Sequence, residues 1–301
     1  MISCIVILLT SFFFMGIVIR TKSYMSGRRG PGILQPMKDI IRLLKKGRVV
    51  SNTSSFIFNI APSISFATIL MAICFVPFGK ERGLISFEGD FVFFAYILAL
   101  GKFFTIILAM DTGSSFEGMG ASREALYSLL AEPAFFILMG SFSLFTGSTS
   151  FYDIFTALYF ESYIPYVLGI LATFVLMTLA MIENSRMPID DPKTHLELTM
   201  IHEVMILDSS GFDLGLLLFT NFLRFALYGA LIANFFITPF ETREAIVLFF
   251  AIQIVFAILV GFFESFRARL RLSHNAQFIF TLTSISLMIF FGVLMIRGKF
   301  M

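Results

Sequence analysis

Eight apolar runs, each long enough to cross a lipid bilayer, divide this 301-residue chain along its whole length. They lie at residues 2–19, 56–78, 91–110, 125–146, 163–183, 212–236, 245–263 and 276–296. About 20 apolar residues in a helix cross the ~30 Å hydrocarbon core of a bilayer. Backbone groups cannot stay unpaired in lipid, and the runs lack the alternation of barrel strands, so helices are expected. The sequence predicts an all-α integral membrane protein with eight transmembrane helices in one polytopic domain, residues 1–301.

The composition excludes a water-soluble globule, because only 14% of the residues are charged and 57% are hydrophobic. Soluble domains carry about 25% charged residues. The first run has no basic residues before it and no small-residue cleavage site after it. We therefore expect a retained transmembrane helix rather than a signal peptide.

The distribution of lysine and arginine predicts the orientation of the chain. Fifteen of these residues lie in the loops after the first, third, fifth and seventh runs, and five lie in the other loops and the C-terminal tail. Basic residues favour the cytoplasmic side of a membrane. The predicted cytoplasmic loops are 20–55, 111–124, 184–211 and 264–275, with both termini outside.

The first cytoplasmic loop contains a predicted amphipathic helix. Met37, Ile40, Ile41 and Leu44 share one face at helical spacing, and Pro36 suits a helix start. Such a helix anchors a protein in the membrane interface. The same helix could instead form a shelf for a peripheral subunit.

Four ionisable residues fall within or at the edge of the predicted spans: Lys102, Glu132, Glu183 and Arg224. A charge at the centre of a bilayer is costly, at least ~2.5–3.5 kcal/mol, and often marks an ion path. Glu132 is the sharpest case, because Pro133 follows it and no cation is near in the sequence. The structural alternative is an internal salt bridge from Glu132 to Lys102 or Arg224.

The stretch from Met181 to Gly211 gathers ten ionisable residues between two apolar runs. Asp191-Pro192 predicts a helix start, after which His195, Thr199 and His202 share one face, with Glu203 close by. The spacing matches no zinc motif, so we expect no metal. Histidines and clustered carboxylates instead suit proton exchange at the membrane surface.

The loop at 111–124 is rich in glycine and serine and ends at Arg123-Glu124. It predicts a flexible turn with ordinary caps and no phosphate site, because no Gly-Lys-Ser/Thr follows the glycines. Cys4 and Cys74 lie far apart in apolar runs, which excludes a cysteine cluster for iron–sulfur or zinc.

Three long motifs carry a resemblance to a known family. They are "GRRGPGILQPMKDIIRLLKKG" (27–47), "DTGSSFEGMGASREALYSLLAEP" (111–133) and "ENSRMPIDDPKTHLELTMIHE" (183–203). They resemble the family of respiratory complex I membrane subunit 1. Within it they are most similar to the hydrogenase branch, found in formate hydrogenlyase, hydrogenase-4 and other group 4 membrane-bound hydrogenases. The likeness covers essentially the entire chain, including "RARLRL" after the seventh run.

The resemblance implies a multi-pass subunit of the cell (inner) membrane that docks a peripheral redox arm and links electron transfer to proton or sodium translocation. By matching position, the first-loop residues Arg28, Arg29, Gly30 and Pro31, together with Arg186 and Pro188, are the expected partner-docking residues. Changing Glu132 or Glu197 to a neutral isostere should abolish ion pumping and spare redox activity. The expected ion path comprises Lys102, Glu124, Glu132, Glu183, Asp190, Asp191, His195, Glu197, His202 and Glu203.

The third cytoplasmic loop departs from the quinone-reducing members of the family. Those members carry three acids where this chain has Lys193, His195 and Glu197. The stretch from Glu197 to Asp208 is also longer than in their pattern. Both features resemble the hydrogenase branch and disfavour quinone binding.

The resemblance also implies which partners would carry the chemistry. We expect no cofactor in this chain, a [NiFe] centre in a hydrogenase-type large subunit, and clusters in a small iron–sulfur subunit and a ferredoxin-like subunit. Antiporter-like membrane subunits and membrane lipid complete the expected partners, without nucleic acid. The alternatives are the equivalent subunit of a quinone- or ferredoxin-linked complex, and a free-standing secondary transporter. Secondary transporters are often built from inverted repeats, and the sequence contains none. A lipid-anchored scaffold without an ion role would leave Glu132 unexplained.

Overall fold

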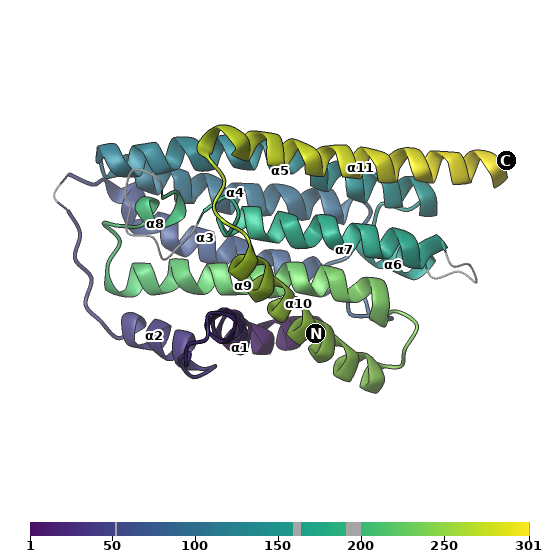
Figure 1. The fold of residues 1–301 in the computed structure, drawn as a ribbon, viewed down its shortest axis with the longest axis horizontal. Helices are drawn as coiled ribbons and strands as arrows, with labels where there is room; N and C mark the ends of the chain where they lie inside the picture. Colours follow the sequence, from purple (N-terminus) through teal and green to yellow (C-terminus); the bar gives the residue numbers. More distant parts are fainter. Residues whose placement is uncertain (52, 159–163, 191–199, 301) are drawn as a thin grey trace.

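The protein is a bundle of long helices in a computed structural model that describes residues 1–51, 53–158, 164–190 and 200–300 (Figure 1). Within this part of the chain, 77% of the residues are helical and no strand forms. Seven helices are long and apolar enough to cross a membrane, which confirms the predicted class. They are α1 (Ile2–Met25), α3 (Phe56–Phe75), α4 (Asp90–Asp111), α5 (Ser115–Thr146), α9 (Gly211–Ile237), α10 (Thr242–Phe266) and α11 (Leu272–Phe300).

The eighth predicted span coincides with α7 (Ile164–Glu183), a helix of 20 residues. Its fully described part, Val167–Glu183, is apolar and lies between α5 and α9. The orientation of the bundle, with both termini outside, stays a prediction.

Helix α9 forms the centre of the bundle, and 83% of its most apolar window is buried. It packs against α1, α2, α3, α7 and α10. Small residues on α9 let its neighbours approach closely, as at membrane-helix interfaces generally. A Cβ atom added at Gly229 would lie 2.3 Å from the Gln253 side chain of α10. Phenylalanine fills the remaining space, for example where the rings of Phe14 and Phe225 stack with centroids 5.5 Å apart.

The predicted amphipathic helix is confirmed as α2 (Gln35–Leu44). Met37 and Ile40 are buried, whereas Ile41 is 41% exposed. The close approach of Gly215 on α9 to Leu43 and Leu44 fixes α2 against the bundle. Its apolar face therefore rests partly on protein, and its position in the membrane interface stays a prediction.

The predicted flexible loop at 111–124 is wrong over most of its length, because α5 begins at Ser115. Ser114 is extended at the N-cap, and Glu117 lies in the first turn, where the helix dipole favours an acid. Gly120 allows the helix to touch its neighbour, since an added Cβ would lie 2.8 Å from the carbonyl oxygen of Ile201. Tertiary packing makes this glycine-rich stretch helical, and α5 extends about 48 Å.

The helix predicted to run from Asp191 past His202 is interrupted before its end. Residues 191–199 lie outside the described residues, and Met200 and Ile201 are not helical. The short helix α8 begins at His202 (His202–Met205). The Asp190 carboxylate accepts hydrogen bonds from the backbone N–H groups of Ile201 and His202, at 2.8 and 3.2 Å. These bonds satisfy backbone donors that a continuous helix would have used. The remaining helix, α6 (Phe151–Ala157), packs against α5.

Candidate ion-path site

The centre of the site is Lys102 on α4, whose ammonium group is shared by two carboxylates. Its Nζ lies 2.5 Å from Glu124 Oε1 on α5 and 3.0 Å from Glu183 Oε2 at the end of α7. The same ammonium donates to the backbone carbonyl of Glu183 at 3.0 Å. The side chains of Lys102 and Glu124 are only 8% and 4% exposed. Three helices thus bring one cation and two acids together in the interior.

Further polar contacts hold both acids in place. Ser185 donates to Glu124 Oε2 at 2.8 Å. Arg224 on α9 donates to the Glu183 backbone carbonyl at 3.2 Å. Buried charges are tolerated only when ion pairs and hydrogen bonds replace lost hydration. The cluster contains both, and its residual charge depends on how many protons the acids carry.

Two small cavities meet at Lys102. The first has a volume of about 40 Å³ and is lined by Lys102, Ser128, Glu132, Glu183 and Tyr228, with apolar residues around them. The second has a volume of about 10 Å³ and is lined by Lys102, Glu124, His202, Asn221 and Arg224 among others. A single water needs roughly 10–15 Å³ of such space and two to four polar partners. The first cavity therefore has room for a few waters, and the second for about one.

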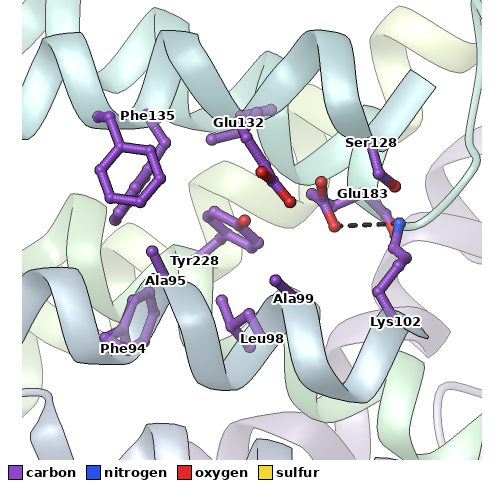
Figure 2. Close-up of a pocket in the computed structure, with 12 residues that line it drawn as sticks. Phe94, Ala95, Leu98, Ala99, Lys102, Ser128, Glu132, Phe135, Glu183 and Tyr228 are labelled. Atoms are coloured by element: carbon purple, nitrogen blue, oxygen red, sulfur yellow. Dashed lines mark hydrogen bonds and ion pairs between the residues drawn. The ribbon is translucent and has the colours of Figure 1, made fainter. Parts of the chain in front are cut away.

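Glu132 borders the first cavity from α5, and Figure 2 shows its carboxylate pointing towards Glu183 and Tyr228. The predicted alternative, a salt bridge from Glu132 to Lys102 or Arg224, is absent from the described residues; Lys102 pairs with Glu124 and Glu183 instead. Glu132 is also exposed at the side of the bundle, next to Leu129, which is 67% exposed. The acid therefore faces the cavity and the lateral surface together.

His202 and Asp190 form the end of the cluster near α8. The His202 Nε2 lies 2.6 Å from the Asn221 amide nitrogen, beside the second cavity. Burial lowers the pKa of His202 to about 4, so the imidazole is neutral near pH 7. Asp190 is 1% exposed and pairs with Arg269 at 3.0 Å.

The predicted docking residues divide into two groups. Arg28, Arg29, Gly30 and Pro31 are exposed between α1 and α2, where a partner could reach them. Arg186 and Pro188 instead point inward. The Arg186 guanidinium contacts Glu264 at 2.6 Å, and Pro188 is buried. These two residues shape the α7–α8 connection rather than offering a free surface.

Three predicted ion-path residues, Asp191, His195 and Glu197, lie outside the described residues. Glu203 is on α8, partly buried, one residue from His202. The structure brings together Lys102, Glu124, Glu132, Glu183 and His202 of the predicted set. Across the described part of the chain, no group of three or more histidines, cysteines or acids could hold a metal ion.

Sequence reasoning missed several members of the network. Ser185, Tyr228 and Asn221 carry no signal, because polar side chains of these types are common at helix ends and in cores. Glu264 gave a signal that could have been used. It is an acid inside the apolar stretch "VGFFESF", and in the structure it binds Arg186 and lies 3.6 Å from Lys22.

The fold and the site together define a class: a polytopic helical membrane protein with a buried ionic cluster between its helices. The family model described as NADH dehydrogenase matches residues 1–295. The chain therefore belongs to this family, whose members resemble complex I subunit 1.

Three curated relatives illustrate the breadth of the family. The chain is 28% identical to formate hydrogenlyase subunit 4 of Escherichia coli (strain K12), over 85% of each chain. It is 33% identical to hydrogenase-4 component C of the same strain, over 48% of this chain and 46% of the relative. It is 25% identical to a subunit of the NADH-quinone oxidoreductase of Rickettsia rickettsii (strain Iowa), over 72% of this chain and 66% of the relative.

A solved structure shares the fold. A chain in the structure of the membrane-bound sulfane sulfur reductase, an archaeal respiratory membrane complex, superposes with a TM-score of 0.79 over 97% of both chains, at 19% identity. The resemblance to the complex I subunit 1 family, predicted from three motifs, is thus confirmed.

Proposed function

We propose that this chain is the membrane-anchoring and coupling subunit of an energy-converting hydrogenase or formate hydrogenlyase-type complex in the cell membrane. It docks a peripheral redox arm on its cytoplasmic face and links electron transfer to the translocation of protons or sodium ions. The arm would hold the [NiFe] centre and the iron–sulfur clusters. The two relatives from hydrogenase systems support this branch.

The observation that carries the proposal is the position of Lys102 between two small cavities that ionisable residues border. Its ammonium contacts Glu124 towards the cavity of His202, and Glu183 towards the cavity of Glu132. A shift of the ammonium towards either acid strengthens one ion pair and weakens the other, because attraction falls with distance. The acid left without a counter-charge then binds a proton more tightly. Lys102 can thus convert a change of charge near α8 into a change of protonation near Glu132.

The lateral position of Glu132 supports a membrane partner on the α4–α5 side of the bundle. An acid that faces lipid at membrane depth is costly. Around it, Tyr96 of α4 is 65% exposed and Leu129 of α5 is 67% exposed, which provides an apolar surface for another helix. An antiporter-like subunit seated here would cover Glu132 and receive the ion.

The experiment compares Glu132→Gln with a matched control, Glu241→Gln, in sealed vesicles that contain the intact complex. Glu241 is an exposed acid at the N-cap of α10 and lines neither of the two cavities. We expect the Glu132 variant to keep the redox activity of the arm with an artificial electron acceptor and to lose ion translocation at least tenfold. The control should keep both. Full translocation by Glu132→Gln would contradict the proposal, and copurification of a nickel–iron subunit would establish the branch.

A further inference from the structure

A long apolar groove lies on the side of the bundle where α10 crosses α9 obliquely and approaches α7 (Figure 1). Its volume is about 430 Å³, and ten residues line it: Thr173, Met177, Ile232, Phe236, Leu248, Ala251, Ile252, Val255, Phe256 and Leu259. The groove is open to the side, since Val255 and Leu259 are 54% and 40% exposed. No residue of the ion-path cluster borders it.

A second, smaller hollow continues the groove towards the α10–α11 connection. Met177 lines both spaces, and Met187, Phe263 and Arg267 line the second one. From Leu248 to Leu259 the groove follows α10 for about 17 Å, and Arg267 comes another eight residues on. One leaflet of a ~30 Å hydrocarbon core is about 15 Å deep. The two hollows together therefore match a chain that enters from one membrane surface and passes the middle of the bilayer.

The charges at the end of this groove indicate what occupies it. Arg267 and Arg271 are exposed, and neither makes an ion pair within the described part of the chain. Arg269, between them, is 3.0 Å from the buried Asp190. Basic residues at the cytoplasmic ends of membrane helices bind anionic lipid headgroups. Arg267 lines the second hollow, and Arg271 follows four residues later in the same connection. An exposed cation at this end of an apolar groove complements a phosphate headgroup with acyl chains.

The lining of the groove suits an acyl chain. Nine of its ten lining residues are apolar, and Thr173 is the tenth. An acyl chain has no polar group and adapts its shape, so it fits a space lined in this way.

We propose that the α7–α9–α10 groove is a binding site for an anionic phospholipid, with its phosphate at Arg267 and Arg271 and an acyl chain along Leu259 to Leu248. The bound lipid also contacts the α7–α8 connection, since Met187 and Pro188 line the second hollow. The backbone N–H of Leu270 donates to the Pro188 carbonyl at 2.9 Å. The lipid thus stabilises the segment that connects the ion-path cluster to the α10–α11 connection.

The absence of tryptophan from the sequence makes a direct test possible. A single reporter, Leu259→Trp, is placed at the rim of the groove, and Val247→Trp serves as the matched control. Val247 is 72% exposed on the same helix and does not line the groove. The full chain is reconstituted in phosphatidylcholine vesicles that contain increasing amounts of brominated phosphatidylglycerol or brominated phosphatidylcholine, which quench tryptophan fluorescence on contact.

We expect brominated phosphatidylglycerol to quench Leu259→Trp at a far lower mole fraction than brominated phosphatidylcholine. Two basic residues near a headgroup give a preference of about 30-fold. Arg267→Gln with Arg271→Gln should remove this preference, and Val247→Trp should show none. Ala251→Phe, which fills the groove, should weaken quenching by both lipids at Leu259→Trp.

Three results would overturn the proposal. The first is equal quenching of Leu259→Trp by the two lipids, and the second is a preference that survives both arginine substitutions. The third is the loss of all quenching in the intact complex, which would show that a protein subunit covers the groove. As a control, each variant should have the same thermal unfolding midpoint as the unmodified chain, which separates these results from misfolding.

Discussion

At the scale of single residues, the site depends on an uneven number of charges. One ammonium, Lys102, lies between two carboxylates, so neither acid has a counter-ion of its own. The protonation of these two carboxylates is sensitive to any nearby change of charge, because electrostatic interactions are strong where water is scarce. The same imbalance makes the cluster costly to disrupt.

Lys102→Met should destabilise the protein by about 3–5 kcal/mol, because it leaves Glu124 and Glu183 buried without their cation. Glu124→Gln should have a smaller effect, since Lys102 keeps its pair with Glu183. The double variant Lys102→Met with Glu124→Gln should be more stable than Lys102→Met alone, because it leaves one fewer carboxylate without a cation. Thermal unfolding of the detergent-purified chain tests this order. An unfolding midpoint for Lys102→Met equal to that of the unmodified protein would contradict it.

The free energy of unfolding should fall as the pH drops from about 6.5 to 4. The unfolded chain gains a proton on His202 below its ordinary pKa of about 6.5. The folded chain does not gain it until the pKa of about 4. The loss is on the order of 2 kcal/mol at pH 5 and reaches a plateau below the folded pKa.

His202→Asn should remove this part of the pH dependence, and His274→Asn, at an exposed position, should leave it unchanged. Unfolding midpoints between pH 7.5 and 5 provide the measurement. Identical slopes for the His202 variant and the unmodified chain would exclude a neutral imidazole at this partly buried position.

The sequence predicted which residues belong to the cluster better than it predicted which of them pair with one another. Lys102, Glu132, Glu183 and Arg224 were evident as charges in apolar runs. The pairing of Lys102 with Glu124 was not, because Glu124 was assigned to a loop. The relative rotation of α4 and α5 decides which side chains meet, and this rotation depends on packing between helices rather than on local pattern.

At the scale of helices, the apolar runs predicted the central part of each span but not its ends. The predicted run 125–146 became α5, Ser115–Thr146, because glycine and serine continued the helix against α8. The reverse happened at Met200-Ile201, where Asp190 binds the backbone and interrupts a predicted helix. Long-range contacts, which no local pattern records, decided both boundaries.

Two glycines in the first turns of α5 give a matched test of this explanation. Gly120→Ala should destabilise the protein by about 1–3 kcal/mol, because the new methyl group collides with the Ile201 carbonyl at 2.8 Å. Gly118→Ala should stabilise it by up to about 1 kcal/mol, because nothing lies within 4 Å and alanine favours helix. Chemical denaturation measures both. A stabilising effect at Gly120 would mean that α5 and α8 are not in close contact.

At the scale of the whole molecule, the helical membrane class and the family were predictable from the sequence, because both depend on long stretches. The apolar groove beside α10 was not, since it results from the oblique crossing of two helices that the sequence places in separate runs. The orientation in the membrane stays a prediction, which rests on the distribution of basic residues alone.

Cysteine labelling in intact cells tests this orientation. In a chain with Cys4→Ala and Cys74→Ala, Thr149→Cys should react with a membrane-impermeant reagent, and Ser273→Cys, in the predicted cytoplasmic loop 264–275, should not. Both positions are exposed on the isolated chain. Permeabilised cells should label both. Reaction at position 273 alone in intact cells would reverse the predicted topology.

We propose that electron transfer in a docked arm changes the protonation of Glu132 and Glu183. Redox-difference infrared spectroscopy of the intact complex tests it most directly, because protonated carboxyl groups absorb separately from carboxylates. We predict a carboxyl signal on reduction that disappears in Glu132→Gln or Glu183→Gln and persists in Glu241→Gln. The same difference spectrum in all variants would contradict the claim.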